Sequence, residues 1–336
     1  MNKQRMILIV PITLVAMVGW LSGCGASGDG VPSQKVTLAM GYVPNVQFTP
    51  FYVALDKGYF AEEGIELEFD YGWETDLLKL LGSNELQFAL ASGDQVILAR
   101  GQGLPVVYVM NWYRRFPVCI VSLAETGIRE PSDLVGMRVG TPALYGASYI
   151  GWRAFLDSVG VDEADVELIS IGYTQVAALS EGQVDAAICY AMNEPVQMQA
   201  AGQAIDIMYM ADYVNLVSNG LITNERTIGE LPGLVQGMVR ASLRGLAYTL
   251  EYPDEAFRIS LEYVPEAASN AETEAINRAI LEKCVEFWRP DPGELGLSDQ
   301  AEWERAQRVM RLMGLVDGEG DVTAMFTNQF VLEVKP

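Results

Sequence analysis

Residues 35–71, KVTLAMGYVPNVQFTPFYVALDKGYFAEEGIELEFDY, contain the pattern that decides the fold. The apolar run at 35–40 and the alternating run at 65–72 are typical of β-strands, and residues 49–60 between them favour a helix. A strand, a helix and a second strand in this order form the β–α–β unit of a parallel sheet. The quoted stretch therefore predicts an α/β protein.

The same alternation continues along the chain. The next four expected elements are helix, strand, helix and strand, at 75–85, 86–92, 93–103 and 105–113. A second α/β unit occupies about 123–221, and the chain becomes mainly helical after Asn224. This order predicts two α/β lobes, each a mostly parallel sheet with helices on both faces, and a helical C-terminal tail.

Composition limits the classes of function. The chain has 336 residues, of which 50% are hydrophobic and 20% charged, so it is long enough for about two well-packed domains. Its formal net charge of −22 opposes binding to nucleic acid. It contains no histidine, which excludes a Ser–His triad and lowers the expectation of an enzyme. We expect a protein without catalysis, bound metal or cofactor.

The N-terminus predicts export and attachment to a membrane. A short basic start precedes the apolar run 6–21, as in a secretory signal peptide. The following LSGCG resembles a bacterial lipobox, in which Cys24 would carry the lipid. We therefore expect a signal peptide at 1–23 and a lipidated, Gly/Ser-rich tether at 24–35.

Three cysteines remain in the expected mature chain, Cys119, Cys189 and Cys284. Cys119 and Cys189 lie in apolar runs typical of strands, which favours buried thiols. No Cys-x-x-Cys spacing indicates a metal or redox site.

Three stretches together resemble the periplasmic substrate-binding proteins of ABC importers. They are YVPNVQFTPFYVALDKGYFAEEGIELEF (42–69), PSDLVGMRVGTP (131–142) and ISIGYTQVAALSEGQVDAAICYAMNEP (169–195). They are most similar to the branch that binds thiamine pyrimidine precursors, alkanesulfonates or riboflavin. The resemblance implies an extracytoplasmic monomer, held at the membrane by the lipid on Cys24, with an ABC permease and its ATPase as partners.

The resemblance also implies a type II periplasmic binding fold, two doubly wound lobes joined by a two-strand hinge. Lobe one would comprise 36–120 and 222–336, and lobe two would be the insert 121–221. The strands crossing the hinge would lie near 117–123 and 218–224.

Candidate ligand-binding residues of lobe one follow the ends of its expected strands, where open α/β sheets bind ligands. They are Asn45, Gln47, Phe48, Ser92, Asp94, Asn111, Trp112 and Tyr113. Amides can pair with a heterocycle edge and aromatic rings can stack on it. Asn45 and Asp94 could instead cap helices, and Trp112 could belong to the core. Trp73 and Trp288 are interpreted as core residues.

Lobe two supplies a second set by the same reasoning: Tyr145, Ser148, Tyr173, Tyr190, Asn193 and Glu194. The resemblance implies that Glu194 matches an acidic residue that pairs with ring nitrogens and an amino group in the pyrimidine-precursor binders. A surface position for Glu194 is the alternative.

The candidate set is aromatic and mostly neutral, which opposes a sulfonate or phosphate as the main determinant. A flat heterocycle fits better. Riboflavin is the first choice, because its large ring would use several aromatic side chains, and an aminopyrimidine precursor of thiamine is the second. Two alternatives from other classes are a pyrimidine-synthesising enzyme and a ligand-sensing domain. The resemblance implies that the enzymes use a lysine and a histidine, and this chain has no histidine.

Overall fold

The computed structural model describes residues 33–318 and 320–334. The expected signal peptide, Cys24 and most of the expected tether lie outside the described residues. The last two tether positions belong to the first strand, which begins at Gln34. Within 33–318 and 320–334, no helix combines the length and the apolar character needed to cross a bilayer.

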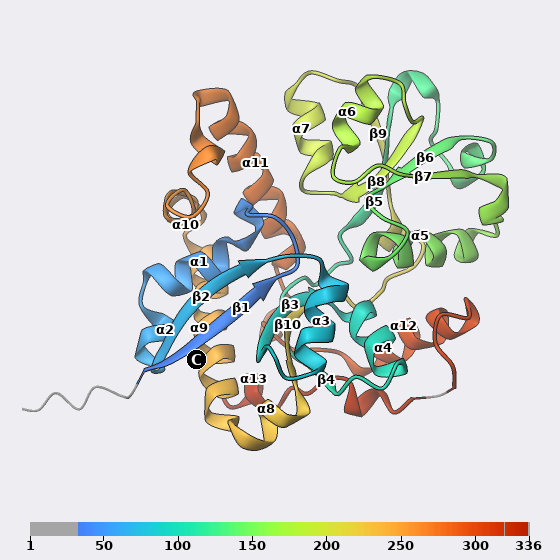
Figure 1. Ribbon diagram of the computed structural model, residues 1–336. Helices are drawn as coiled ribbons and strands as arrows, with labels where there is room; N and C mark the ends of the chain where they lie inside the picture. Colours follow the sequence, from blue (N-terminus) through green and yellow to red (C-terminus); the bar gives the residue numbers. More distant parts are fainter. Residues whose placement is uncertain (1–32, 319, 335–336) are drawn as a thin grey trace, which may run out of the picture. The chain divides into compact units, whose positions relative to one another are not determined.

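The first of two five-stranded sheets has the order β2–β1–β3–β10–β4 (Figure 1). Its strands are β1 (Gln34–Met40), β2 (Ile65–Tyr71), β3 (Phe88–Ser92), β4 (Val106–Asn111) and β10 (Asn219–Asn224). Strand β1 pairs in parallel with β2 and β3, whereas β10 is antiparallel to β3 and β4.

The second sheet has the order β7–β6–β8–β5–β9. Its strands are β5 (Val118–Leu123), β6 (Arg138–Thr141), β7 (Glu167–Ser170), β8 (Ala186–Tyr190) and β9 (Ile205–Tyr209). Strand β5 is antiparallel to β8 and β9. Both sheets are thus mixed, because β5 and β10 are the strands that enter each sheet after the chain has left the other one.

The chain passes between the sheets at residues 112–117 and 210–218. The expected boundaries at 120/121 and 221/222 fall inside β5 and β10, and each of these strands pairs throughout with one sheet. We propose that the lobe boundaries lie in the two connecting segments.

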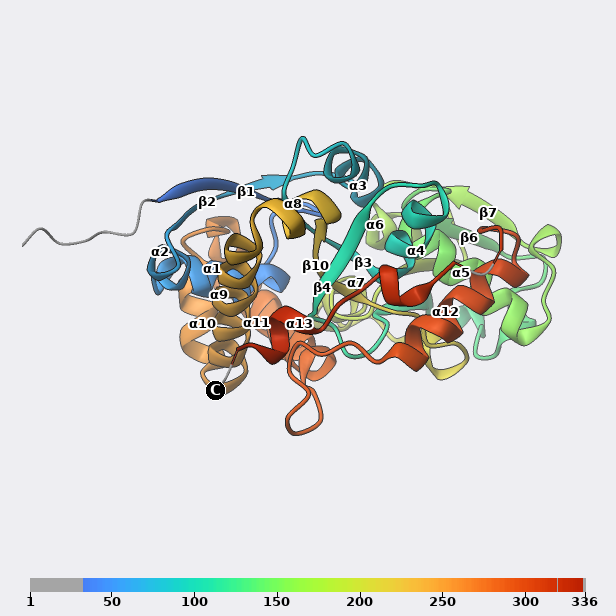
Figure 2. The same cartoon turned by 90° about the horizontal axis from the view of Figure 1, so that it is seen from below.

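The side chains of the first sheet alternate between two apolar layers, as strand geometry requires. Leu38 and Met40 of β1 face a layer that includes α1 (Thr49–Asp56), α9 (Pro232–Glu251) and α11 (Ala271–Trp288). Ala39 faces the opposite layer. That layer includes α3 (Glu74–Gly82), α4 (Gly93–Gly101) and α12 (Gln300–Leu312). Figure 2 shows α1, α9 and α10 (Pro253–Ser260) together on one side of β1 and β2.

The second sheet is covered in the same way. Helices α6 (Gln175–Ser180) and α7 (Glu194–Ala200) pack on one face and α5 (Gly146–Val159) on the other. The remaining α-helices are α2 (Tyr59–Glu62), α8 (Glu225–Glu230), α10 (Pro253–Ser260) and α13 (Gln329–Leu332).

Two predicted helices are each divided in two. The helix expected at 49–60 is interrupted at Gly58, whose φ of 75° is left-handed and therefore ends the helical backbone. The long helical stretch after Asn224 breaks before Pro253, which has no backbone N–H to donate to the preceding turn.

Helices α1 and α9 approach closely at Gly245. A Cβ atom there would lie 2.1 Å from the carbonyl oxygen of Pro50 and 2.8 Å from the Cβ of Ala54. We expect Gly245→Ala to lower the free energy of unfolding by about 1–3 kcal/mol, because the backbone must shift to admit the methyl group. Urea titration followed by circular dichroism measures the change.

The matched control is Gly229→Ala in α8, where a Cβ atom would meet nothing within 4 Å. This variant should be unchanged or up to about 1 kcal/mol more stable, since alanine favours a helix. Equal stabilities for the two variants would contradict the close contact between α1 and α9.

Candidate functional site

A cavity with about 800 Å³ of empty space, which includes space open to solvent, lies between the lobes at the ends of their strands. It is lined by Gly41, Tyr42, Gln47, Phe48, Trp73, Glu74, Thr75, Leu90, Trp112, Pro142, Tyr145, Gly146, Ala147, Ser148, Tyr173, Gln175, Cys189, Tyr190, Asn193, Glu194 and Asn219. Most of these residues lie in the segments that follow strands or in the first turn of the helices after them, which is where open α/β sheets bind ligands.

The structure brings nine of the fourteen candidate residues to this cavity. They are Gln47, Phe48, Trp112, Tyr145, Ser148, Tyr173, Tyr190, Asn193 and Glu194. Both lobes contribute, as a clamp requires. Contact of these residues with a ligand stays a prediction.

Three other candidates do not line the cavity, and their polar groups serve the fold. Asn45 caps the 3₁₀ helix η1 (Val46–Phe48), its Oδ1 accepting the backbone N–H of Gln47 at 2.8 Å. Asn111 donates to the Tyr108 hydroxyl at 3.3 Å. Tyr113 donates to Gln47 Oε1 at 3.3 Å and so fixes a residue that does line the cavity.

Ser92 and Asp94, at the junction of β3 and α4, do not line the cavity either. Ser92 Oγ donates to Glu74 Oε2 at 3.0 Å. Asp94 accepts from Gln95 Nε2 at 3.1 Å, and burial raises the pKa of its carboxyl to about 6.

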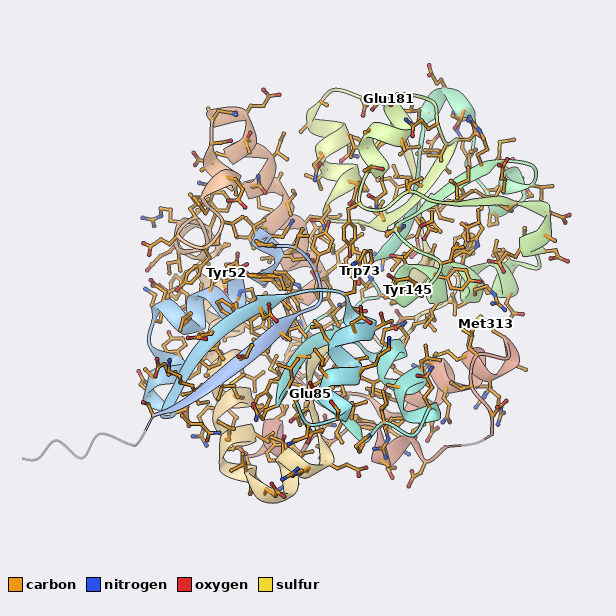
Figure 3. All side chains as sticks on the ribbon, viewed as in Figure 1. Tyr52, Trp73, Glu85, Tyr145, Glu181 and Met313 are labelled. Atoms are coloured by element: carbon orange, nitrogen blue, oxygen red, sulfur yellow. The ribbon has the colours of Figure 1, made fainter. Side chains whose placement is uncertain are left out.

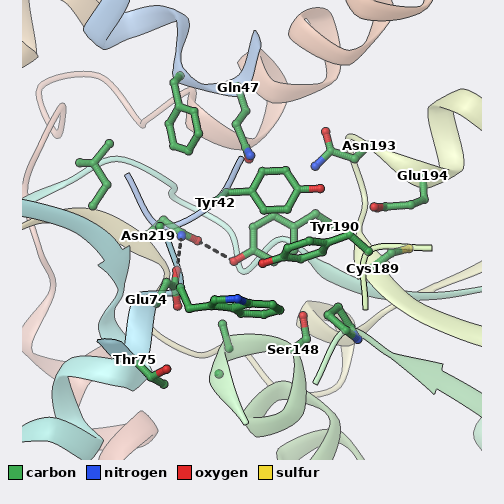
Figure 4. A pocket seen from close by; sticks show the side chains of 18 of the residues that line it. Tyr42, Gln47, Glu74, Thr75, Ser148, Cys189, Tyr190, Asn193, Glu194 and Asn219 are labelled. Atoms are coloured by element: carbon green, nitrogen blue, oxygen red, sulfur yellow. Dashed lines mark hydrogen bonds between the residues drawn. The ribbon is translucent and has the colours of Figure 1, made fainter. Parts of the chain in front are cut away.

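Glu74, the first residue of α3, is the carboxyl group that lobe one presents to the cavity. Its Oε1 accepts from Asn219 Nδ2 at 3.2 Å, and Asn219 Oδ1 accepts from the Tyr190 hydroxyl of lobe two at 3.3 Å (Figure 4). Burial, and then the charge of nearby Asp94, raise the pKa of Glu74 to about 8.

Glu194 is the carboxyl group of lobe two, at the start of α7. Only 7% of its surface is exposed, and its Oε2 has no hydrogen-bond partner among the described residues. Burial raises its pKa to about 7. Figure 4 shows the Glu194 carboxyl and the Asn193 amide both directed toward the cavity. Together they offer an acceptor and a donor to one edge of a ligand.

The aromatic rings of the cavity belong to two groups. Trp112 is 2% exposed and packs against Phe48, Phe51, Tyr113 and Trp288, with centroids 4.7–5.8 Å away. Trp73 instead meets rings of lobe two: Tyr145 at 5.7 Å, which Figure 3 labels beside it, and Tyr173 at 4.8 Å.

The sequence reasoning missed several lining residues, chiefly Tyr42, Trp73, Glu74, Gln175 and Asn219. The stretch GWET at 72–75 could have been predicted to line the cavity, because it follows β2 just as PNVQF follows β1. Asn219 gave no such signal, because it begins an antiparallel strand. In the part of the chain that is described, no three His, Cys, Asp or Glu side chains are grouped to hold a metal ion.

Two mixed β-sheets covered by helices, with a cavity between the ends of their strands, define a two-lobed binding protein. The structure is similar to the alkanesulfonate-binding protein SsuA of Xanthomonas axonopodis pv. citri, with a TM-score of 0.66, 14% identity and coverage of 88% of this chain and 98% of that one. This likeness confirms the periplasmic binding protein fold.

The NMT1/THI5-like family model matches residues 45–256, and the chain belongs to this family. It is 44% identical over 304 residues to the riboflavin-binding protein RibY of Chloroflexus aurantiacus, covering 89% of this chain and 86% of that protein. It is 30% identical over 306 residues to the formylaminopyrimidine-binding protein of Halalkalibacterium halodurans, with coverage of 87% and 90%. The protein is a substrate-binding protein.

The raised pKa of Glu74 predicts a pH-dependent stability. The Glu74 carboxyl binds its proton more tightly in the folded state than in the unfolded state. The stabilisation of the folded state by this proton is complete below the ordinary glutamate pKa and is lost as pH rises through about 8. The free energy of unfolding of the native chain should decrease between pH 5 and pH 8. We expect this decrease to be smaller by roughly 2 kcal/mol in Glu74→Gln. Urea titrations at several pH values measure it.

Glu194 has a pKa raised in the same sense and should preserve part of the slope in this variant. Glu68→Gln serves as the control, because the side chain of Glu68 is 67% exposed on β2. Identical slopes for Glu74→Gln and the native chain would show that Glu74 is not the titrating group.

Proposed function

We propose that this protein captures riboflavin outside the cytoplasm and delivers it to an ABC importer. The observation that carries the ligand is the likeness to the riboflavin-binding protein, which extends over most of both chains. The proposed partners are a permease with its ATPase, and the proposed anchor is a lipid on Cys24. We expect a monomer without catalytic activity.

The cavity supports a flat, uncharged, hydrogen-bonding ligand. Its wall combines aromatic rings from both lobes with the amides of Gln47 and Asn193 and the hydroxyl of Ser148. The described residues that line it include two glutamates and no lysine or arginine. A phosphate group would meet no cation there, so riboflavin is favoured over its phosphate ester.

The test is retention of flavin by the full-length chain purified in detergent. After addition of riboflavin and desalting, we expect a visible flavin absorption band at near one equivalent per chain. Titration should give a riboflavin affinity at least about ten times that for flavin mononucleotide, because the phosphate has no cationic partner. Desalted detergent without protein is the blank.

A colourless protein would contradict riboflavin as the ligand. Calorimetry with an aminopyrimidine then tests the second candidate, which the likeness to the formylaminopyrimidine-binding protein and the position of Glu194 favour.

The anchor is tested by Cys24→Ser. We expect the native chain in the membrane fraction, carrying fatty acid that can be labelled in growing cells, because the lipid supplies the attachment. The variant should carry no label and should lose its native distribution. A native chain that takes up no labelled fatty acid would contradict the lipid anchor.

A further inference from the structure

A ring of lobe two lies between two rings of lobe one. Tyr173 stacks on Trp73 with a centroid distance of 4.8 Å and an interplanar angle of 14°. Tyr42 contacts the same Tyr173 ring with a centroid distance of 4.8 Å and an interplanar angle of 86°, so these two rings are perpendicular. Trp73 precedes α3 and Tyr42 follows β1, whereas Tyr173 belongs to the loop between β7 and α6.

These contacts have the geometry with which aromatic side chains hold a planar ring. Trp73 stacks in parallel on the Tyr173 ring, and Tyr42 meets the Tyr173 ring in a T-shaped arrangement. Both rings follow neighbouring parallel strands, β1 and β2, so the sheet fixes their separation. We call Tyr42 and Trp73 the ring slot.

The ring slot also borders the cavity. Tyr42, Trp73 and Tyr173 all line it. Tyr173 is 40% exposed and follows Gly172, whose φ of 62° is left-handed, so the ring stands on a turn rather than within a core. Trp112, by comparison, is packed among four rings of its own lobe.

We propose that the ring slot is the subsite for the planar ring of the ligand and that Tyr173 occupies it when no ligand is bound. Opening of the lobes withdraws Tyr173, because it moves with lobe two while Tyr42 and Trp73 stay with lobe one. The ligand ring then takes the place of the phenol ring. Tyr173 is thus a competitor, a role different from the ligand contact expected from the sequence.

A competitor and a contact have opposite signatures. Removing a competitor strengthens the apparent affinity for every ring ligand by the same factor, because the fraction of protein with a free slot rises equally for all of them. This gain in apparent affinity comes from a higher association rate. Removing a contact weakens binding, and the dissociation rate rises.

The experiment compares the full-length native chain with Tyr173→Ala, using riboflavin and lumichrome, which has the flavin ring without the ribityl chain. The inference rests on the proposed function in using flavins as probes. We expect about three- to tenfold tighter binding of both probes by Tyr173→Ala, the same factor for each, with faster association and unchanged dissociation. Stopped-flow flavin fluorescence measures both rates.

Three further variants complete the design. Tyr173→Phe keeps the ring and therefore the competition, so it should bind both probes more weakly than Tyr173→Ala does. Trp73→Leu removes the face of the slot and should weaken both probes by about tenfold or more. Tyr213→Ala is the matched control, since Tyr213 is 45% exposed and does not line the cavity. It should leave both affinities unchanged.

The outcomes separate the two proposals. If the native chain binds riboflavin and Tyr173→Ala binds it equally or more weakly, the occupied slot is overturned and the riboflavin proposal stands. If neither protein binds either probe, both proposals are overturned. If only Tyr173→Ala binds, the occupied slot is supported and Tyr173 blocks the native site.

Discussion

One amide connects the two lobes at the cavity. Asn219 donates to Glu74 within lobe one and accepts from Tyr190 of lobe two. It is the first residue of β10, immediately after the chain returns from the second sheet. The position of this amide depends on the first sheet, because β10 pairs with β3 and β4 and so places Asn219 beside Glu74. The cavity is therefore a consequence of how the chain returns to its first sheet.

Local patterns were enough to predict most strands and helices of the first half, since alternation and apolar runs depend only on neighbouring residues. Strand direction was not predictable in this way. Strands β5 and β10 read as ordinary strands, yet both pair antiparallel, because their direction is set where the chain crosses between sheets. Strand β9 was not predicted, for a related reason: it becomes a strand of the sheet only by pairing with β5.

The site was predicted best where a loop follows a parallel strand. Gln47 and Phe48 after β1, and Asn193 and Glu194 after β8, all reach the cavity. Ser92 has the same local signature but does not line the cavity, and it donates to Glu74. Whether a strand-end residue faces the cavity depends on which residues of neighbouring strands stand in front of it, and that is a property of the assembled sheet.

The two tryptophans show why residue type alone does not identify a ring-binding position. A ring can stack on a ligand only with a face that its own lobe leaves free. Trp112 follows β4, and Phe51 of α1 and Trp288 of α11 surround it. Trp73 follows β2 at the opposite edge of the sheet, and its ring contacts come from Tyr145 and Tyr173 of lobe two. In the proposed opening of the lobes, Trp73 loses these contacts and Trp112 keeps its own, so of these two rings Trp73 is the one that becomes free.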